Sequence, residues 1–388
     1  MPYKNTDTNH HRGKMGQNQP LELSAEQGEL ASELLVDWFL NGVQALVDTA
    51  GSEEAVKLLW PYFRNAENAA LLIIMKAFGL DQKDRIAMGF YFAVTWNFIS
   101  RTPVVRARVF QRGAISTVSG CPFSDGPDAI CTVFCEKETY NKALEVPYQS
   151  TLVSCAARGD KECKWVMKPF GRQDLKDESD LGPMIADILN WELPKEMVDS
   201  FSVQYLAEFW ILATKALIDH LGEERVASML APYMKHRGAS FGLKRSSASH
   251  GAFDLLRITS SICLIDGALH MEPSSTLPEL NMVERTIVDC PFREAPVAVC
   301  QQFEAFCNGI CEAIDPDYKF AYDCMMTKGD KTCHWTIRKK GEATKEKAKE
   351  EGTADDPIKR LTNKYIDEEI AKEEYEEKMA IIKKHYPR

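Results

Sequence analysis

The sequence predicts an α+β protein in which one module occurs twice. Each copy is expected to be a helical half followed by a small antiparallel sheet with a cysteine-rich metal site. Two repeats predict this organisation. The stretch from Cys121 to Trp165 recurs from Cys290 to Trp335, with steps of ten and then twenty-four residues between the first three cysteines of each copy. Upstream, residues 45–63 (ALVDTAGSEEAVKLLWPYF) recur as residues 216–234 (ALIDHLGEERVASMLAPYM), so the duplication includes the helices.

Length and composition narrow the class of protein. A chain of 388 residues that is 45% hydrophobic can bury two cores. The net charge of -10 argues against nucleic acid as a main partner, because phosphate binding needs a dense basic surface. No continuous apolar run is long enough for a membrane span, and the N-terminus lacks the apolar centre of a signal peptide. We therefore expect a cytoplasmic protein whose cysteines are reduced thiols or metal ligands.

The expected order of segments follows from composition and from the repeat. It is a disordered leader at 1–22, a first module at 23–170, a linker at 171–200, a second module at 201–338, a charged spacer at 339–356 and a short helical C-terminal tail at 357–388.

Apolar periodicity predicts the helices of the first module. Apolar residues fall at three- and four-residue spacing between Leu34 and Val47, which indicates an amphipathic helix that ends at Gly51. Residues 86–99 are apolar and aromatic on nearly all sides, which indicates a helix that is buried over most of its surface.

Alternation predicts the strands. Val105, Ala107 and Val109 alternate with polar residues, so this segment is expected to form the strand that leads into the CPF turn, with residues 283–288 as its counterpart. In each copy a Gly-Asp pair separates two short apolar segments and predicts a hairpin turn.

The repeated cysteines suggest a metal site in each copy. The expected ligands are Cys121, Cys131, Cys155, Cys163, Cys290, Cys300, Cys324 and Cys333. Zinc in structural sites takes four thiolate or imidazole ligands, so we predict two zinc ions per chain. Buried reduced thiols, an iron–sulfur cluster and a nucleophilic cysteine at Cys121 or Cys290 remain as alternatives. The cluster ranks below zinc because no C-x-x-C-x-x-C run is present. Cys135, Cys263, Cys307 and Cys311 do not recur and are expected to be buried thiols without chemistry.

The cysteine frame resembles two known families. The segments CAARGDKECKW and CMMTKGDKTCHW, each preceded by CPF, resemble the vinyl-4-reductase type domain, a small-molecule-binding module. The helical entry before CPF is similar to the L-2-amino-thiazoline-4-carboxylate hydrolase-like family. These resemblances cover roughly residues 34–167 and 205–338.

The first resemblance also implies a ligand set. In sensor members of that family three cysteines and a glutamate hold zinc, and the glutamate lies three residues before the first hairpin cysteine. That position is Leu152 in the first copy and Ala321 in the second, so the resemblance implies that Cys121 and Cys290 supply the fourth ligand instead.

The last residues, from Asp356 onward, resemble the short C-terminal domain (SHOCT-like) that ends many unrelated bacterial proteins. This resemblance implies self-association, so we expect a homo-oligomer.

Three functions are compatible with these features. The leading hypothesis is a metal-stabilised tandem protein that binds a small apolar, aromatic or sulfur-containing molecule. Its pocket is expected in the first copy, at Phe90, Tyr91, Val94 and Trp96. The alternatives are a hydrolase that opens a small heterocycle of the thiazoline type and a structural subunit of a larger complex, so the sequence leaves open whether the protein is an enzyme. We also predict that the two copies pack as a pseudo-twofold pair, because duplicated domains often keep the contact of an ancestral homodimer.

Overall fold

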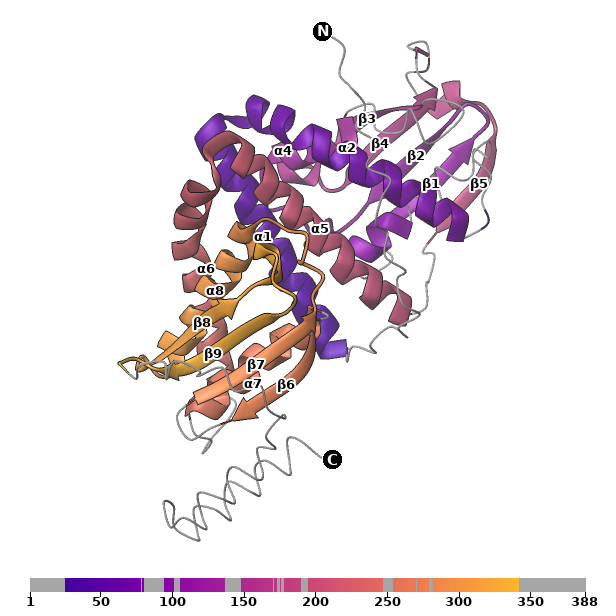
Figure 1. The fold of residues 1–388 in the computed structure, drawn as a ribbon. Coiled ribbons are helices and arrows are strands. Elements are labelled where there is room, and N and C mark those ends of the chain that lie inside the picture. Colours follow the sequence, from indigo (N-terminus) through magenta and orange to yellow (C-terminus); the bar gives the residue numbers. More distant parts are fainter. Residues whose placement is uncertain are drawn as a thin grey trace, which may run out of the picture.

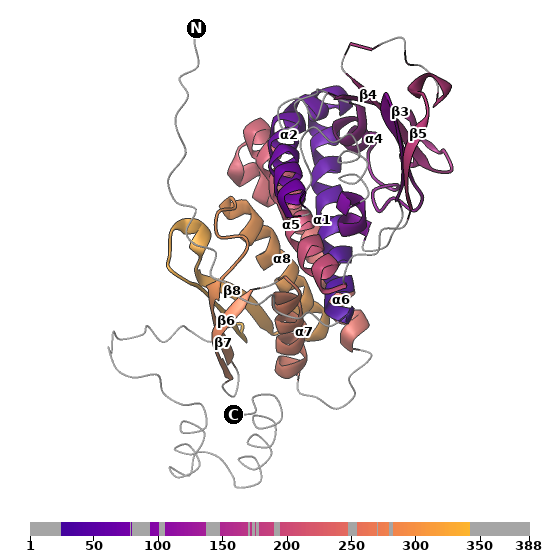
Figure 2. The same ribbon diagram turned by 90° about the vertical axis from the view of Figure 1, so that its right-hand side faces the viewer.

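The chain is an α+β protein in which helices lie between two antiparallel sheets (Figure 1). The computed structural model describes residues 25–77, 79, 94–100, 105–136, 148–169, 171–172, 175, 178–189, 195–246, 254–269, 271–278 and 282–341. The predicted leader and C-terminal tail, together with Phe90 and Tyr91, lie outside the described residues. The second view shows the helices stacked between the sheets (Figure 2).

Each module begins with two long helices. These are α1 (Ala25–Ala50) and α2 (Ser52–Ala77) in the first module, and α5 (Lys195–Leu221) and α6 (Glu223–Ser246) in the second. A single glycine separates the helices of each pair. Gly51 and Gly222 have φ of 82° and 83°, a left-handed conformation that glycine adopts without steric cost, and this conformation ends the first helix in both modules.

The two sheets share one strand order. The first contains β1 (Val105–Phe110), β2 (Gly113–Val118), β3 (Tyr148–Ser154), β4 (Cys163–Pro169) and β5 (Met184–Leu189), in the order β3-β4-β2-β1-β5. The second contains β6 (Glu272–Pro278), β7 (Met282–Asp289), β8 (Tyr318–Cys324) and β9 (Cys333–Lys339), in the order β6-β7-β9-β8. Strands β3, β4, β2 and β1 therefore correspond to β8, β9, β7 and β6.

Two details of the sheets differ from the sequence expectation. The strand that leads into the first CPF turn is β2, which forms a hairpin with β1, so the counterpart of residues 283–288 is β2 and not the segment around Val105. The alternating pattern of β1 continues into β2 across the tight turn, which hid the boundary between the strands. In addition, β5 falls in the segment expected to be a linker. It pairs with β1, and Arg106 Nη2 lies 2.6 Å from Asp187 Oδ2.

Shorter helices complete each module. In the first module, residues 94–100 are helical, and α4 (Asp128–Cys131) continues into a π-helical turn at Thr132–Glu136. In the second module, α7 (Asp254–Ala268) and the long α8 (Val297–Ile314) occupy the corresponding places.

The two modules pack through α1 and α5, which are equivalent helices. Exchanging the modules relates residues 171 positions apart in these helices, so Trp38 corresponds to Phe209 and Phe39 to Trp210. The rings of Trp38 and Trp210 are 4.7 Å apart, and those of Phe39 and Phe209 are 5.7 Å apart. When each residue is replaced by its counterpart in the other module, the Trp38–Trp210 contact becomes the Phe39–Phe209 contact. This reciprocity identifies a pseudo-twofold axis between the modules, as predicted.

The same interface accounts for the apolar character of α1. Residues Gln27–Ala50 are long and apolar enough to cross a membrane, although 44% of the most apolar window is buried inside the protein. Leu35, Trp38 and Val43 are fully buried in the core that α1 shares with α5. The apolar residues of α1 are thus used in packing between the modules.

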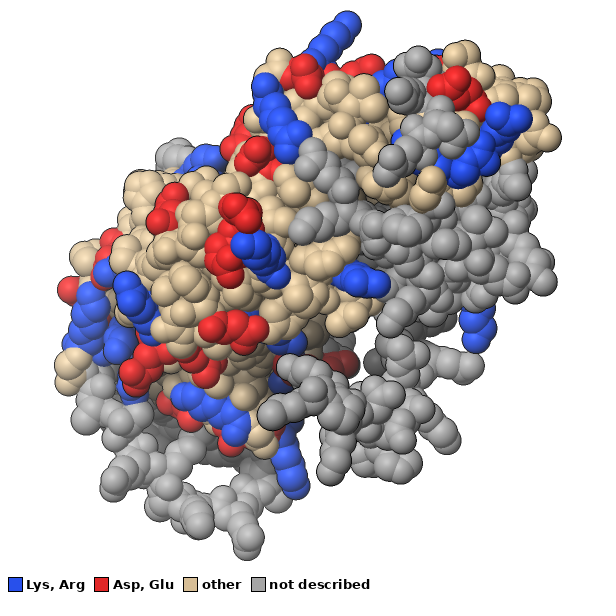
Figure 3. All heavy atoms as spheres, turned by 90° about the horizontal axis from the view of Figure 1, so that it is seen from above, with Lys and Arg blue, Asp and Glu red and all other residues tan. Residues whose placement is uncertain are grey.

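Charged residues are mixed on the surface. On the face in Figure 3, acidic and basic side chains alternate over the described part of the chain, without an extended basic stripe.

Candidate functional site

The hairpin that carries the cysteines has the same geometry in both modules. A 3-10 turn, Ala156–Arg158 or Met326–Lys328, leads to a glycine with φ of 94° or 92°. The aspartate after that glycine accepts a backbone hydrogen bond from the residue before the turn. In the first module this donor is Cys155 N, 2.7 Å from Asp160 Oδ2. In the second it is Met325 N, 2.8 Å from Asp330 Oδ2.

Met325 is therefore the counterpart of Cys155, and the predicted pairing of Cys155 with Cys324 is wrong. Cys324 takes the place of Ser154. Its Sγ lies 3.3 Å from Thr332 O, just as Ser154 Oγ donates to Glu162 O at 2.9 Å. The second copy carries one additional residue between Cys300 and β8, and Cys324 restores the spacing of twenty-four only by coincidence.

The corrected register changes the expected ligand set. Cys290, Cys300 and Cys333 correspond to Cys121, Cys131 and Cys163, whereas the fourth position of the second module is a methionine. The counterpart of Leu152 is Tyr322, not Ala321, because each pairs with the tryptophan that follows the last cysteine. The sequence contained a signal for this register. The Gly-Asp pairs are fixed by the turn, and counting four residues back from Gly159 and Gly329 gives Cys155 and Met325.

The first module brings its four cysteines together in the core. Cys121 follows β2, Cys131 ends α4, Cys155 precedes the 3-10 turn and Cys163 begins β4. All four are buried. Hydrogen bonds connect Cys121 to Cys163, Cys163 to Cys155, and Cys155 to Cys131. The sulfur atoms of distant elements thus form one continuous chain of contacts.

These contacts separate the acidities of the thiols. The hydrogen bond from Cys121 lowers the pKa of Cys163 to about 6, although burial opposes the shift. The same hydrogen bond, together with burial, raises the pKa of Cys121 far above its ordinary value. Burial, followed by the bond to Cys155, also raises the pKa of Cys131. Cys163 thus ionises more readily than Cys121 and Cys131.

Within the described residues, no group of three or more histidine, cysteine, aspartate or glutamate side chains is arranged to hold a metal ion. The donor chemistry nevertheless fits zinc, which accepts four thiolates.

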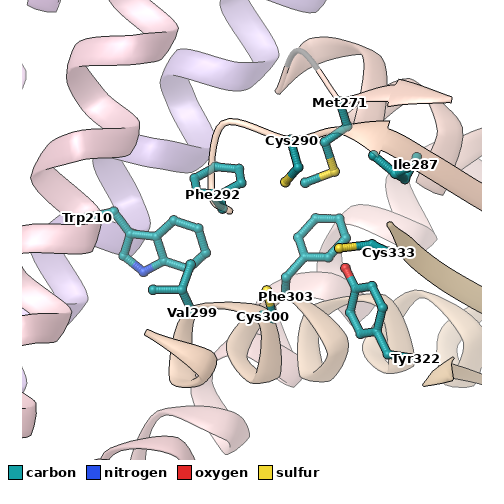
Figure 4. A pocket seen from close by; sticks show the side chains of 10 residues that line it. All are labelled: Trp210, Met271, Ile287, Cys290, Phe292, Val299, Cys300, Phe303, Tyr322 and Cys333. Carbon is teal, nitrogen blue, oxygen red and sulfur yellow. The ribbon is translucent and has the colours of Figure 1, made fainter. Parts of the chain in front are cut away.

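The second module contains an enclosed cavity where its cysteines meet the core (Figure 4). Its volume is about 10 Å³, which matches a single water-sized guest. The wall combines three thiols, one thioether and aromatic rings, contributed by Trp210, Met271, Ile287, Cys290, Phe292, Val299, Cys300, Phe303, Tyr322 and Cys333. Cys324 is absent from this wall.

The polar groups of the cavity wall are neutral at pH 7. Burial raises the pKa of Cys290 and Cys333. Burial also raises the pKa of Cys300 to about 11, although a hydrogen bond from Thr327 opposes this shift. Burial likewise raises the pKa of Tyr322 well above its ordinary value. The cavity therefore presents uncharged, polarisable sulfur and aromatic surface to a guest.

A buried ion pair lies one side-chain layer beyond the cavity. Ile287 pairs with Cys333 at the cavity, and two residues along the same strands Arg285 pairs with Trp335 on the same face of the sheet. Arg285 Nε is 3.1 Å from Asp266 Oδ2, and Arg285 Nη1 is 2.8 Å from Cys263 Sγ. Burial raises the pKa of Asp266 to about 7, although Arg285 opposes the shift. The sequence analysis missed this pair, because a single aspartate within an apolar helix gives no indication of its partner.

The predicted ligand-binding residues of the first module are only partly described. Val94 and Trp96 are buried, and the Trp96 ring packs 5.9 Å from Trp165 and 6.0 Å from Phe123. They contribute to the core beside the cysteine cluster. A pocket that also involves Phe90 and Tyr91 stays a prediction.

Comparisons with known proteins do not assign this chain to a family. No family model matches the chain, and no curated protein matches it.

Proposed function

We propose that this chain is a metal-stabilised tandem binding protein whose two modules have different functions. In this proposal the first module binds zinc, and the second module binds a small apolar, aromatic or sulfur-containing molecule. The observation that carries the proposal is the divergence at one hairpin position. The first module has Cys155 there, in a cluster of four thiols, whereas the second has Met325, and only three cysteines line the cavity of that module.

The zinc half of the proposal rests on donor chemistry. Cys121, Cys131, Cys155 and Cys163 come from four separate elements, so a shared ion would cross-link β2, α4 and the β3–β4 hairpin. Cys163, with its lowered pKa, is already suited to act as a thiolate ligand. A zinc ion with four protein ligands has no open position for a substrate, so its contribution is structural. The second module has only three of these cysteines and is not expected to form the same closed centre.

The binding half rests on the cavity. Its neutral thiols and aromatic rings suit a polarisable apolar guest better than an ion. Met271 lies in the wall, and the flexible side chain of methionine allows such a wall to adjust to guests of different shape. A ligand larger than water enters by displacing these side chains.

Native mass spectrometry of the protein purified under reducing conditions tests both halves at once. We expect the mass of the chain plus one zinc ion, and an additional mass after exposure to small aromatic or sulfur heterocycles. A chain without zinc contradicts the structural half. A chain with zinc that takes up no member of such a panel contradicts the binding half.

A further inference from the structure

A second hollow lies beside the cavity, on the outer surface where the two modules meet. It is an open groove of about 270 Å³, formed by α2, α5, the start of α6, the loop before α8 and the second hairpin turn. The residues that matter for its chemistry are Tyr62, Lys215, Asp219, Glu223 and Thr327.

Neighbouring residues at the start of α8 line the groove and the cavity. Pro296 and Val297 line the groove, whereas Val299 and Cys300, on the next residues of α8, line the cavity. Figure 4 shows Val299 and Cys300 at the start of α8, on the side that faces the cavity. Thr327 lines the groove, and its Oγ1 lies 3.4 Å from Cys300 Sγ. The Thr327 hydroxyl on the groove side thus contacts the Cys300 thiol on the cavity side.

The charged groups of the groove favour a positively charged ligand group. Two acidic residues and one basic residue line it, so their formal charge sums to minus one. Tyr62 hydroxyl donates to Asp219 Oδ2, and Ala298 N donates to Glu223 Oε1 at 3.1 Å. These bonds hold both carboxylates in place without neutralising them. An ammonium group would find two oriented carboxylates and the ring of Tyr62, which are the partners that such cations prefer.

We propose that the groove is the mouth of the cavity and that the two hollows form one binding site. The site would take a small molecule with an apolar ring or chain, held among the sulfur and aromatic side chains, and a positively charged head, held at Asp219 and Glu223. The contact between Thr327 and Cys300 is the constriction between the two parts. This inference rests on the proposed binding function and adds the route and the class of ligand.

The reactivity of Cys300 tests the route without knowledge of the natural ligand. The full-length protein is treated with methyl methanethiosulfonate at pH 8, and the modification of each cysteine is followed by peptide mass mapping. Cys307 is the internal reference, because it lies on the same helix, is completely buried and does not line the cavity. We expect Cys300 to react several-fold faster than Cys307. If Cys300 and Cys307 are modified at equal rates, both in the wild type and in the Thr327→Ser variant described below, the proposed route is wrong.

Two substitutions at Thr327 control the constriction. Thr327→Ser keeps the hydroxyl and removes a methyl group, so we expect faster modification of Cys300. Thr327→Trp adds bulk on a partly exposed turn and is expected to slow it. An unchanged rate at Cys307 shows that neither variant has loosened the whole module. If both variants leave the rate at Cys300 unchanged, Thr327 is not the constriction and the proposal fails.

Protection by small probes tests the ligand class in the same assay. We expect benzylamine to protect Cys300 better than benzyl alcohol, and Asp219→Asn to remove the difference. Equal protection by the two probes in the wild type overturns the positively charged head. These results are distinct from the binding test above. A retained ligand with an unreactive Cys300 rejects only the route, whereas a reactive Cys300 in a protein that binds no small molecule rejects the binding function.

Discussion

Asp266 and Arg285 show that the two modules differ in chemistry as well as in packing. Both side chains are buried in the core of the second module, where an ion pair costs desolvation energy that its own attraction only partly offsets. The residues 169 positions earlier are Asn97 and Ser116, which are polar but uncharged. The charged layer beside the cavity is therefore a feature of the second module alone.

The raised pKa of Asp266 predicts a pH dependence of stability. Its pKa in the folded protein is about 7, above the value of about 3.9 for an unfolded aspartate. Between these values the folded state binds more protons, so the free energy of unfolding falls as the pH rises from about 4 to about 7. We expect Asp266→Asn to remove this component. Urea unfolding of both proteins at several pH values measures it, and identical pH profiles would show that Asp266 does not titrate in this way.

The spacing of the repeated cysteines identified some of the clustered residues correctly and one wrongly. The assignment of Cys121, Cys131 and Cys163 to one cluster follows correctly from the sequence, because the repeat fixes those positions. Cys324 was misassigned because equal spacing does not report a one-residue insertion that a nearby cysteine compensates. Side-chain direction in the hairpin separates Cys324 from Met325, and that direction depends on the register of the paired strands.

Helix packing in the second module depends on glycine at close contacts. Helices α6 and α8 approach so closely that a Cβ on Gly238 would lie 1.9 Å from Phe306 O, and one on Gly309 would lie 2.0 Å from Lys235 O. The contact between α1 and α5 leaves more space for a side chain. A Cβ on Gly42 in α1 would meet Cβ of Ala213 at 3.5 Å, an ordinary van der Waals distance.

These distances predict opposite effects of the same substitution. Gly238→Ala should destabilise the protein by about 1 to 3 kcal/mol, because the backbone of α8 must move. Gly42→Ala should be neutral or stabilising by up to about 1 kcal/mol, since alanine favours the helix and no atom must shift. Chemical denaturation of the two variants provides the comparison. Equal effects would contradict the close approach of α6 and α8.

Apolar periodicity predicted the long helices correctly but missed some of the strands and their boundaries. The long helices and their glycine ends follow from apolar spacing and from the duplication. The hairpin β1–β2 was missed because a tight turn does not interrupt alternation. The strand β5 was missed because its six residues lie within a segment that is otherwise charged and contains two prolines, Pro183 and Pro194. Pairing of β5 with β1 is a long-range contact, and local sequence does not encode it.

The last described strand of the second sheet reaches almost to the end of the described residues. The last strand, β9, reaches Lys339, and Lys340 N donates to Asp317 O at 2.6 Å. Within the described residues, the second sheet thus extends to Lys340.

Deletion of residues 342–388 should leave both modules folded and remove self-association. The resemblance of the tail to a short oligomerisation segment is the basis for the second expectation. Unfolding curves and light-scattering mass of the full-length and truncated chains test it. A truncated chain that keeps the full-length oligomeric state would place the self-association within the modules.

If the duplicated modules divide metal binding and ligand binding between them, zinc should depend on the first module alone. The zinc content of two serine variants is measured by elemental analysis after purification under reducing conditions. We expect one zinc per chain in the wild type, none in Cys155→Ser, and an unchanged value of one in Cys324→Ser. Two zinc ions in the wild type, one of them lost in Cys324→Ser, would contradict the division and restore a four-cysteine site in each module.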